Sequence, residues 1–384
     1  FLLSADVLHD SLIQEIKNNI RHDIEQGLEI AFAETEAAPD TEKELNALFA
    51  VAPASVAPPS NALVSEKRFL DAITEAMQQS MQKFPNLVIM GQDVADYGGV
   101  FKATLGFVEQ FGKARVRNTP LCESAIVGAG LGLSINGYKS IVEMQFADFV
   151  TCGFNQIVNN LAKTHYRWGQ NADVVVRMPT GAGVGAGPFH SQSNEAWFFH
   201  VPGLKIVYPA FPADAKGLLN AAIADPNPVM FFEHKALYRS VSGPVPEAWY
   251  TTEIGKAATI RSGNDLTIVT YGFGVHWAME ILDKHPSVSA DLIDLRSLLP
   301  WDEATVMASV KKTGKVIVMH EDTQTGGIGG EITARIAEKC FPYLDAPPVR
   351  IGALDTPVPM SAVLEQNFLP KERFFTALRT LADF

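Results

Sequence analysis

The stretch Leu87-Val-Ile-Met-Gly-Gln-Asp93 is a run of four apolar residues that ends in a glycine and two polar residues. Apolar residues without polar alternation are typical of a strand that is buried on both faces, as in a parallel sheet. Before this run, Phe69, Ile73, Met77 and Met81 recur every four positions and predict an amphipathic helix. A helix followed directly by a doubly buried strand predicts an α/β fold.

Helix and strand patterns alternate from residue 65 to the C-terminus. Such alternation is typical of parallel sheets that carry helices on both faces. We therefore expect an α/β fold of two consecutive three-layer α/β/α domains with mainly parallel sheets, preceded by an isolated helical segment. In the first domain we predict strands at 87–90, 140–146, 174–178, 204–208 and 229–233, and helices at 125–136, 149–166 and 213–224. After a connection at 235–252, we predict strands at 266–271, 288–295 and 315–320, and helices at 275–283, 303–311 and 331–339.

The region before residue 65 has a different pattern. We predict one long amphipathic helix, with Ser11 and Gln14 as its capping box and Pro39-Asp40 as its end. Residues 50–64 are rich in alanine and proline and predict a semi-extended linker. A lone helix must bury its apolar stripe against something, so we interpret residues 1–49 as the tail of another domain. The stripe consists of Ile13, Ile16, Ile20, Ile24, Leu28 and Phe32.

The composition excludes several classes of protein. With 47% hydrophobic and 19% charged residues, the 384-residue chain is globular and not disordered. The net charge of -12 argues against a nucleic-acid partner. We see no signal peptide and no apolar run long enough to span a membrane. The 3 cysteines are unclustered and fit a reducing cytoplasm, so we expect a cytoplasmic protein. The first residue is Phe1 and not methionine, which indicates a fragment or a processed product.

A carboxylate in the segment Asn118-Thr-Pro-Leu-Cys-Glu123 is the first candidate site residue. Glu123 stands among Leu121, Ile126 and Val127, and we expect this apolar environment to raise its pKa. A carboxyl group that holds a proton near neutral pH is suited to proton transfer. The alternative is a glutamate that only stabilises the positive end of the helix that follows. From this segment alone, both interpretations stay open.

Two glycine-rich runs invite comparison with dinucleotide-binding motifs. Residues 128–132 have Leu133 at the third glycine position and lie in a predicted helix, so they fail the fingerprint. Residues 181–187 follow a strand, but Pro188 would break a helix that starts there. We interpret 181–187 as a loop of flexible or closely approached backbone that delivers His190. Histidine is a ready acid or base near neutral pH, although a lone histidine is more often structural.

Two further segments leave alternatives open. Gln145-Phe-Ala-Asp-Phe149 lies at the end of a strand, and its two aromatic residues either stack on a planar ring or belong to the core. Residues 326–330, Gly-Gly-Ile-Gly-Gly, form either a tight turn or an anion site at a helix N-terminus.

Six motifs, in order from about Ser65 to the C-terminus, resemble the β subunit of thiamine-diphosphate-dependent 2-oxoacid dehydrogenases. The branched-chain 2-oxoacid type is the more similar one, because of Leu121-Cys122, Gln-Phe-Ala-Asp and Gly98-Gly-Val-Phe101. Residues 1–49 resemble the C-terminal end of the α subunit, so we interpret the parent polypeptide as an α–β fusion. The motifs are Asn118-Thr-Pro-Leu-Cys-Glu123, Gln145-Phe-Ala-Asp-Phe149, Asn155-Gln-Ile-Val-Asn159, His190-Ser-Gln-Ser193, Leu295-Arg-Ser-Leu-Leu-Pro-Trp-Asp302 and Asp355-Thr-Pro-Val-Pro359.

The resemblance implies a transketolase-like pyrimidine-binding domain at 65–245 and a transketolase C-terminal-like domain at 246–384. It implies that Glu123 bonds a ring nitrogen of the cofactor's aminopyrimidine and promotes the tautomer that removes the thiazolium proton. Gln145, Phe149 and Leu121 would line the pyrimidine, and His190 would donate a proton or stabilise charge. The implied reaction is oxidative decarboxylation of a branched-chain 2-oxoacid with reductive acylation of a lipoyl group.

The resemblance also implies metal ions and partners. The family holds the diphosphate and its Mg²⁺ with a Gly-Asp-Gly…Asn segment of the α subunit, which this chain lacks. We therefore expect no magnesium ligand here and a site at an interface. The implied partners are the α part, in the same fusion or as a separate chain, a second copy of this chain and a lipoyl-bearing acyltransferase core. A potassium site of some relatives matches Ala172, Val174, Val175, Ala222, Asp225 and Asn227.

Three other hypotheses compete with this interpretation, and the first two stay open. The substrate could be pyruvate or acetoin, with the same cofactor. The chain could be a non-catalytic scaffold whose second α/β unit binds the core of the complex. The third hypothesis, a nicotinamide-dependent dehydrogenase, is disfavoured because neither glycine-rich run has the context of a dinucleotide-binding motif.

Overall fold

The computed structural model describes residues 1–52 and 56–384. This chain divides into two compact units, Phe1–Asn46 and Ala47–Phe384. Within the described ranges, no helix is both long enough and apolar enough to cross a membrane. Residues 53–55 of the predicted linker lie outside the described residues.

The first unit consists of α1 (Asp10–Ala33) and the unexpected short helix α2 (Thr41–Asn46). The long amphipathic helix is confirmed, but both of its predicted ends are wrong. His9 is the N-cap, and its ring accepts a hydrogen bond from a backbone N–H at 3.2 Å, so the capping box of Ser11 and Gln14 does not form. α1 ends before Glu34 because acidic residues are unfavourable at the negative end of a helix. No residue of α1 is buried, so its apolar stripe remains exposed.

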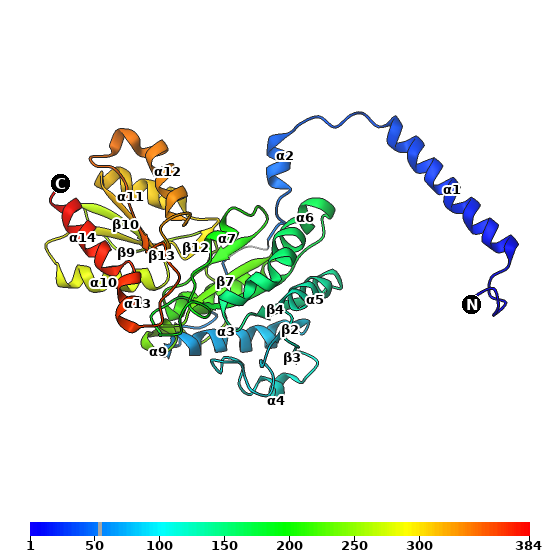
Figure 1. Cartoon of the computed structure of the whole chain (residues 1–384), viewed down its shortest axis with the longest axis horizontal. Coiled ribbons are helices and arrows are strands. Elements are labelled where there is room, and N and C mark those ends of the chain that lie inside the picture. The colour runs from blue at the N-terminus through cyan, green and yellow to red at the C-terminus, as the bar shows by residue number, and fades with distance from the viewer. Residues whose placement is uncertain (53–55) are drawn as a thin grey trace. The chain divides into compact units, whose positions relative to one another are not determined.

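The second unit contains two mainly parallel sheets (Figure 1). The larger sheet has the strand order β12-β6-β7-β5-β4-β2-β3, in which β12 is Ser297–Leu299, and all pairs except β12–β6 are parallel. All five strands predicted for the first domain are present, although those at 140–146 and 204–208 are shorter than expected. The bounds are β2 (Leu87–Gly91), β3 (Val116–Asn118), β4 (Lys139–Glu143), β5 (Val174–Thr180), β6 (Lys205–Val207) and β7 (Val229–His234).

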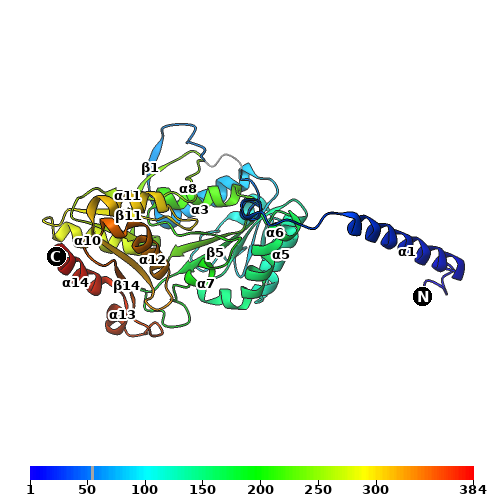
Figure 2. The same ribbon diagram turned by 90° about the horizontal axis from the view of Figure 1, so that it is seen from above.

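Helices cover both faces of the larger sheet, which confirms the three-layer prediction. Leu87 and Ile89 share a core with α3 and α8, whereas Val88 and Met90 share a core with α5 on the opposite face. Figure 2 shows α3 and α8 together on one side of the sheet and α5 and α6 on the other. Burial on both faces explains why β2 is apolar at consecutive positions. The bounds are α3 (Phe69–Lys83), α4 (Phe107–Phe111), α5 (Glu123–Ile135), α7 (Ala196–Phe199) and α8 (Pro212–Ala224).

The single helix predicted at 149–166 is wrong. In its place lie a 3-10 helix, η1 (Ala147–Gly153), a π-helix, η2 (Gln156–Leu161), and α6 (Ala162–Trp168). Amide side chains bond one another along this segment, and Asn159 Nδ2 donates to Asn155 Oδ1 at 2.7 Å. Asparagine is a poor former of regular α-helix, and π-helical turns are frequent near functional sites.

The smaller sheet has the strand order β14-β13-β10-β11-β9, in which β9 is antiparallel to its neighbour. The predicted strands and helices of this domain are confirmed. Ile268 and Ile317 share a core with α10 and α14, whereas Val269 and Val318 share one with α11 and α12. The bounds are β9 (Ala258–Arg261), β10 (Leu266–Thr270), α10 (Phe273–Lys284), β11 (Ala290–Asp294), α11 (Glu303–Thr313), β13 (Val316–Thr323), α12 (Gly329–Cys340), η3 (Phe341–Tyr343), β14 (Val349–Ala353), α13 (Ala362–Phe368) and α14 (Lys371–Ala382).

Residues 235–252 are not the plain connection that we predicted. They contain α9 (Leu237–Ser240) and β8 (Ser242–Pro246), which pairs antiparallel with β1 (Val64–Arg68). Neither strand has an apolar run, because the pair forms a small sheet of its own with only one buried residue. The chain before β1 also contacts the body of the second unit, where Ala50 exchanges two hydrogen bonds with the Asn227 side chain.

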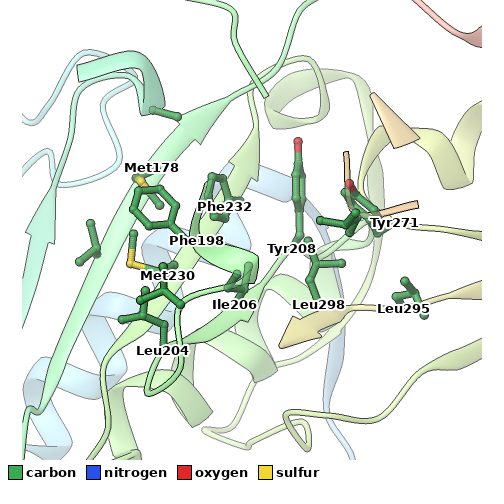
Figure 3. Packing of buried hydrophobic residues seen from close by; sticks show 14 of the residues in the cluster. Met178, Phe198, Leu204, Ile206, Tyr208, Met230, Phe232, Tyr271, Leu295 and Leu298 are labelled. Carbon is green, nitrogen blue, oxygen red and sulfur yellow. The ribbon is translucent and has the colours of Figure 1, made fainter. Parts of the chain in front are cut away.

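One apolar core joins the two larger sheets. β12 (Ser297–Leu299) comes from the second domain but pairs with β6 of the first. Next to this pair, the Tyr208 ring lies 5.7 Å from the Phe232 ring and 5.2 Å from the Tyr271 ring, measured between centroids (Figure 3). The two predicted domains therefore share one body, and their junction is packed like the interior of a single domain.

Candidate active site

Glu123 is the first residue of α5, at the carboxyl edge of the larger sheet. The chain arrives there from β3, and Thr119 N donates to Gly91 O at the end of β2 at 3.0 Å. Directly after β2, the buried Gln92 donates from Nε2 to Glu123 Oε1 at 2.9 Å. Ligands of open α/β sheets bind outside the carboxyl ends of the strands, so Glu123 lies where a ligand is expected.

The apolar environment expected around Glu123 is only partly present. Ile126 and Val127 are buried, but Leu121 is 82% exposed, so its side chain is available to cover a ligand. The Glu123 side chain is half-buried, and no hydrogen bond from the described residues reaches its Oε2 atom. One oxygen of this carboxylate is therefore fixed, and the other is open to a donor.

Gln145 and Glu123 are held by consecutive residues of one turn. Gln145 Nε2 donates to Asp93 Oδ2 at 3.0 Å. Asp93 directly follows Gln92, which donates to Glu123. Asp93 has a positive φ of 58°, a conformation that is uncommon outside glycine and often marks a functional site. The turn after β2 thus connects two of the residues that the sequence singled out.

The structure also brings His190 and Phe149 together. The His190 ring centroid lies 4.8 Å from that of Phe146 and 5.6 Å from that of Phe149, and both contacts are edge-on. Phe101 contacts Phe146 at 5.7 Å and extends this aromatic cluster. The rings at 146 and 149 are therefore half-buried and line one region with the histidine, rather than filling the interior of the domain.

The segment that carries His190 is anchored next to Phe149. Gln192 donates to Asp148 Oδ1 from its backbone N at 3.2 Å and from Nε2 at 2.8 Å. Thr180 Oγ1 donates to Gln192 O at 2.8 Å, which fixes the segment to the end of β5. The loop at 181–187 is closely approached, as predicted, because a Cβ at Gly181 would stand 2.1 Å from His234 Nε2.

Lys235 was missed by the sequence analysis. It follows β7 at the carboxyl edge, is 6% exposed and donates from Nζ to Gly181 O at 2.6 Å. Burial lowers the pKa of Lys235 to about 8. It lines a hollow of about 760 Å³ together with Phe101, Phe146 and Tyr238. A lysine directly after an apolar strand was the available signal, because strand ends at this edge carry function.

Buried carboxylates of β13 were also missed. Glu321 accepts from Ala182 N at 2.6 Å and contacts His234 Nε2 through its other oxygen at 2.6 Å. Burial opposes ionisation of Glu321, but the His234 ring lowers its pKa below the ordinary value. Burial raises the pKa of the neighbouring Asp322 to about 7. Burial also raises the pKa of Glu195, and the charge of Asp322 raises it further. Adjacent acids on one strand are thus shifted in opposite directions.

Known proteins share this architecture along most of the chain. The family model described as Transketolase, pyrimidine binding domain, matches residues 66–241, and the one described as Transketolase, C-terminal domain, matches residues 255–373. The 2-oxoisovalerate dehydrogenase subunit beta of Bacillus subtilis (strain 168) is 44% identical over 84% of this chain and 100% of its own length. This chain belongs to the β-subunit family of the 2-oxoacid dehydrogenases.

Other members of this β-subunit family are almost as similar. The mitochondrial 2-oxoisovalerate dehydrogenase subunit beta 2 of Arabidopsis thaliana is 44% identical over 82% of this chain and 88% of its own length. The pyruvate dehydrogenase E1 component subunit beta of Acholeplasma laidlawii is 40% identical over 82% of this chain and 97% of its own length. A solved split-gene transketolase, an inactive beta4 tetramer, matches 82% of this chain and 98% of its own with a TM-score of 0.67 at 23% identity, which shows the shared fold.

The residues at the carboxyl edge fit the pyrimidine ring for which the matched domain of this β-subunit family is named. A half-buried carboxylate with one open oxygen can accept a ring N–H, and the exposed Leu121 and the half-buried Phe149 offer apolar surfaces to a flat ring. Within the described residues, no group of three or more histidine, cysteine, aspartate or glutamate side chains could hold a metal ion.

The side chains of the candidate potassium site do not fit a cation. Asp225 Oδ2 contacts Lys205 Nζ at 2.5 Å, and Asp225 Oδ1 accepts from Asn227 Nδ2 at 2.8 Å. Asn227 Oδ1 accepts from Ala50 N at 2.8 Å. These three side-chain oxygens already contact donors of the protein. Potassium could therefore be held only by backbone carbonyl groups of the six candidate residues.

Proposed function

We propose that this chain is the β part of a thiamine-diphosphate-dependent dehydrogenase that decarboxylates a branched-chain 2-oxoacid and transfers the acyl product to a lipoyl group. The observation that carries the proposal is the Glu123 carboxylate at the carboxyl edge, fixed at Oε1 by Gln92 and open at Oε2. The relatives of this chain that are named 2-oxoisovalerate dehydrogenase subunit beta are 44% identical to it, and they support the branched-chain substrate.

Four side chains of this chain would hold the aminopyrimidine. Glu123 Oε2 would form a hydrogen bond with a ring nitrogen and would supply the proton that this nitrogen gains in the ring form that activates the cofactor. Leu121 and Phe149 cover the ring, and Gln145, held by Asp93, borders it. When bound, thiamine diphosphate supplies the nucleophilic carbon and the electron sink for decarboxylation.

His190 is the proposed proton donor to oxygen atoms of the substrate. Its ring contacts both Phe146 and Phe149, and the Gln192–Asp148 hydrogen bonds hold the chain that follows it. An imidazole in this position can donate a proton or stabilise negative charge at a neighbouring oxygen. The aromatic rings exclude water from one side of it, which strengthens such interactions.

The remaining parts of the enzyme come from partners. We propose that an α part supplies the groups for the diphosphate and Mg²⁺, and that a second copy of this chain and a lipoyl-bearing acyltransferase core complete the assembly. The exposed apolar stripe of α1, which is buried by nothing in its own unit, supports the interpretation of residues 1–49 as an α-subunit tail. We further propose a cytoplasmic location, supported by 3 free cysteines.

A pyruvate dehydrogenase is the second candidate. Relatives with this name are 40% identical over more than nine-tenths of their own length. The two candidates share cofactor and mechanism and differ in the 2-oxoacid that they prefer.

Calorimetry on this chain and on the protein assembled with its α part tests the proposal. We expect Mg²⁺-dependent binding of thiamine diphosphate only by the assembled protein, which should then turn over 3-methyl-2-oxobutanoate with the highest kcat/KM. The highest kcat/KM with pyruvate would establish the second candidate. A failure of both preparations to bind thiamine diphosphate would overturn the cofactor assignment.

A further inference from the structure

The loop that carries His190 has little support of its own. Gly181, Gly183, Gly185 and Gly187 alternate along it, and all four have positive φ values. Within the loop, His190 N donates to Gly187 O at 3.4 Å, which is a long hydrogen bond. Glycine loses more conformational freedom on ordering than any other residue, so a loop of this composition requires external partners to hold one conformation.

Besides Lys235, which donates from Nζ to Gly181 O at 2.6 Å, two carboxylates of the C-terminal domain provide these partners. Glu365 of α13 accepts from Gly183 N at 3.0 Å and from Gly185 N at 3.3 and 3.4 Å, one distance to each of its oxygens. Glu321 of β13 accepts from Ala182 N at 2.6 Å. The two residues are only 5% and 6% exposed, respectively. A buried carboxylate needs hydrogen-bond donors, and the loop backbone supplies them here.

Further contacts restrict both ends of the same loop. His234, which contacts Glu321 Oε2 at 2.6 Å, packs against Gly181, where a Cβ would overlap its ring. At the other end, a Cβ at Gly187 would stand 2.6 Å from Met360 Cγ. The C-terminal domain thus contacts the loop at its start through Glu321, at its middle through Glu365 and at its end through Met360.

We propose that Glu321 and Glu365 are positioning residues that hold the 181–187 loop and thereby place His190 for the reaction. The inference rests on the proposed function, which gives His190 its role. Neither carboxylate contacts the His190 ring, so each acts through the backbone of the loop. A displacement of about 1 Å of a reacting group can reduce a rate by about 100-fold, so a loosened loop should reduce turnover while substrate affinity is retained.

Glu365 is the more informative position, because Glu321 also contacts His234 and its loss would disturb two elements. In the protein assembled with its α part, Glu365→Ala should increase amide hydrogen exchange in peptides covering 181–190 by about 10-fold. It should lower kcat by about 10- to 100-fold, with KM changed less than about 2-fold. Glu365→Gln should recover part of both effects, because its amide oxygen still accepts one backbone N–H.

Glu338→Ala is the matched control, since Glu338 is an exposed glutamate of the same domain. It should change neither exchange nor kcat. Unchanged exchange at 181–190 in a folded Glu365→Ala protein would overturn the proposal, as would raised exchange with unchanged kcat. If Glu365→Ala does not fold, the comparison of Glu365→Gln with the unaltered protein decides the same question. The exchange measurement needs no substrate, so it remains valid even if no 2-oxoacid is turned over, which is the outcome that would refute the proposed function.

Discussion

Two groups of buried carboxylates in the same body differ in what their neighbours supply. Inside the first domain, Arg177 forms an ion pair with Glu143 and donates to both oxygens of Glu233 at 2.6 Å. At the junction with the second domain, Glu195 and Asp322 interact with each other, and no lysine or arginine side chain of the described residues donates to either. One group contains a buried cation and the other lacks one.

The two groups differ in what opposes the effect of burial on the pKa values. Burial by itself would lower the pKa of Arg177, but Glu233 and Glu143 raise it, so the cation is permanent. Burial raises the pKa of Glu143, and Arg177 opposes this rise. Burial raises the pKa of Asp322 to about 7, and Glu195 Oε1 accepts from the Tyr271 hydroxyl at 2.6 Å while its Oε2 is buried without a partner. Burial alone therefore does not decide whether an acid is ionised. The first group is a structural ion network, and in the second no cation opposes the rise in pKa that burial causes.

Removal of the cation should have the largest effect. Arg177→Met leaves Glu143 and Glu233 buried without a counter-ion, which we expect to lower the free energy of unfolding by about 3–5 kcal/mol. Urea unfolding followed by circular dichroism measures the loss. Adding Glu233→Gln to Arg177→Met should restore part of it, because one uncompensated charge is removed. A loss below about 1 kcal/mol would show that the network is not important for stability.

Glu123 differs from both groups of buried carboxylates, because it is half-buried and accepts from one amide donor. Glu123→Gln should reduce kcat of the assembled protein by at least about 100-fold, equivalent to about 2.7 kcal/mol of barrier, while the melting temperature changes little. Steady-state kinetics and a thermal scan check the two parts. Glu109→Gln, at an exposed glutamate, serves as control and should leave both unchanged. Unaltered activity of Glu123→Gln would favour the scaffold hypothesis.

The group without a cation should make stability pH-dependent. Folded Asp322 has a pKa of about 7, above the value of about 3.9 of an unfolded aspartate, so its proton stabilises the folded state at low pH. This contribution is complete below the unfolded pKa and is lost as the pH rises through 7, with a slope of at most about 1.4 kcal/mol per pH unit. Melting temperatures between pH 5 and 8 should therefore fall less steeply for Asp322→Asn. Parallel curves for Asp322→Asn and the exposed control Asp383→Asn would refute the assignment.

The smallest effect is expected for potassium. The side-chain oxygens of Asp225 and Asn227 already face Lys205 and backbone donors, like the satisfied acids of the Arg177 network. A cation that binds only the folded state raises the melting temperature. We expect a difference below about 1 °C between KCl and NaCl at equal ionic strength. A rise of several degrees specific to potassium would mean that backbone carbonyls form a site without these side chains.

The sequence predicted the interior of both sheets well. Strands such as β2 and β5 are apolar at successive positions because both faces are covered, so local pattern was sufficient. β1, β8 and β12 were missed because they are short or partly exposed and pair with strands distant in sequence. The segment at 149–166 failed because its amide side chains support 3-10 and π-helical turns that apolar spacing does not reveal.

For the site, the residues within motifs could be predicted and their supports could not. Glu123, Gln145, Phe149 and His190 each stand in a motif, and the structure connects Gln145 to the turn that holds Glu123 and places His190 against Phe149. Their assigned roles stay predictions. Lys235 and Glu365 were missed because their significance comes from contacts to a loop far away in the sequence, which composition and spacing do not encode.

The strand β12 has a consequence for any attempt to divide this protein. A piece that ends near residue 246 would lose β12, one of the two partners of β6, and part of the apolar cluster around Tyr208. It would present an unpaired strand edge beside uncovered hydrophobic side chains, a combination that promotes aggregation. Exchange of the C-terminal domain between relatives would therefore have to carry Ser297–Leu299 and a matching set of core residues with it. β12 forms the edge of the first sheet although it belongs to the second domain. The two domains therefore cannot be exchanged as independent units, even though they follow one another in the sequence.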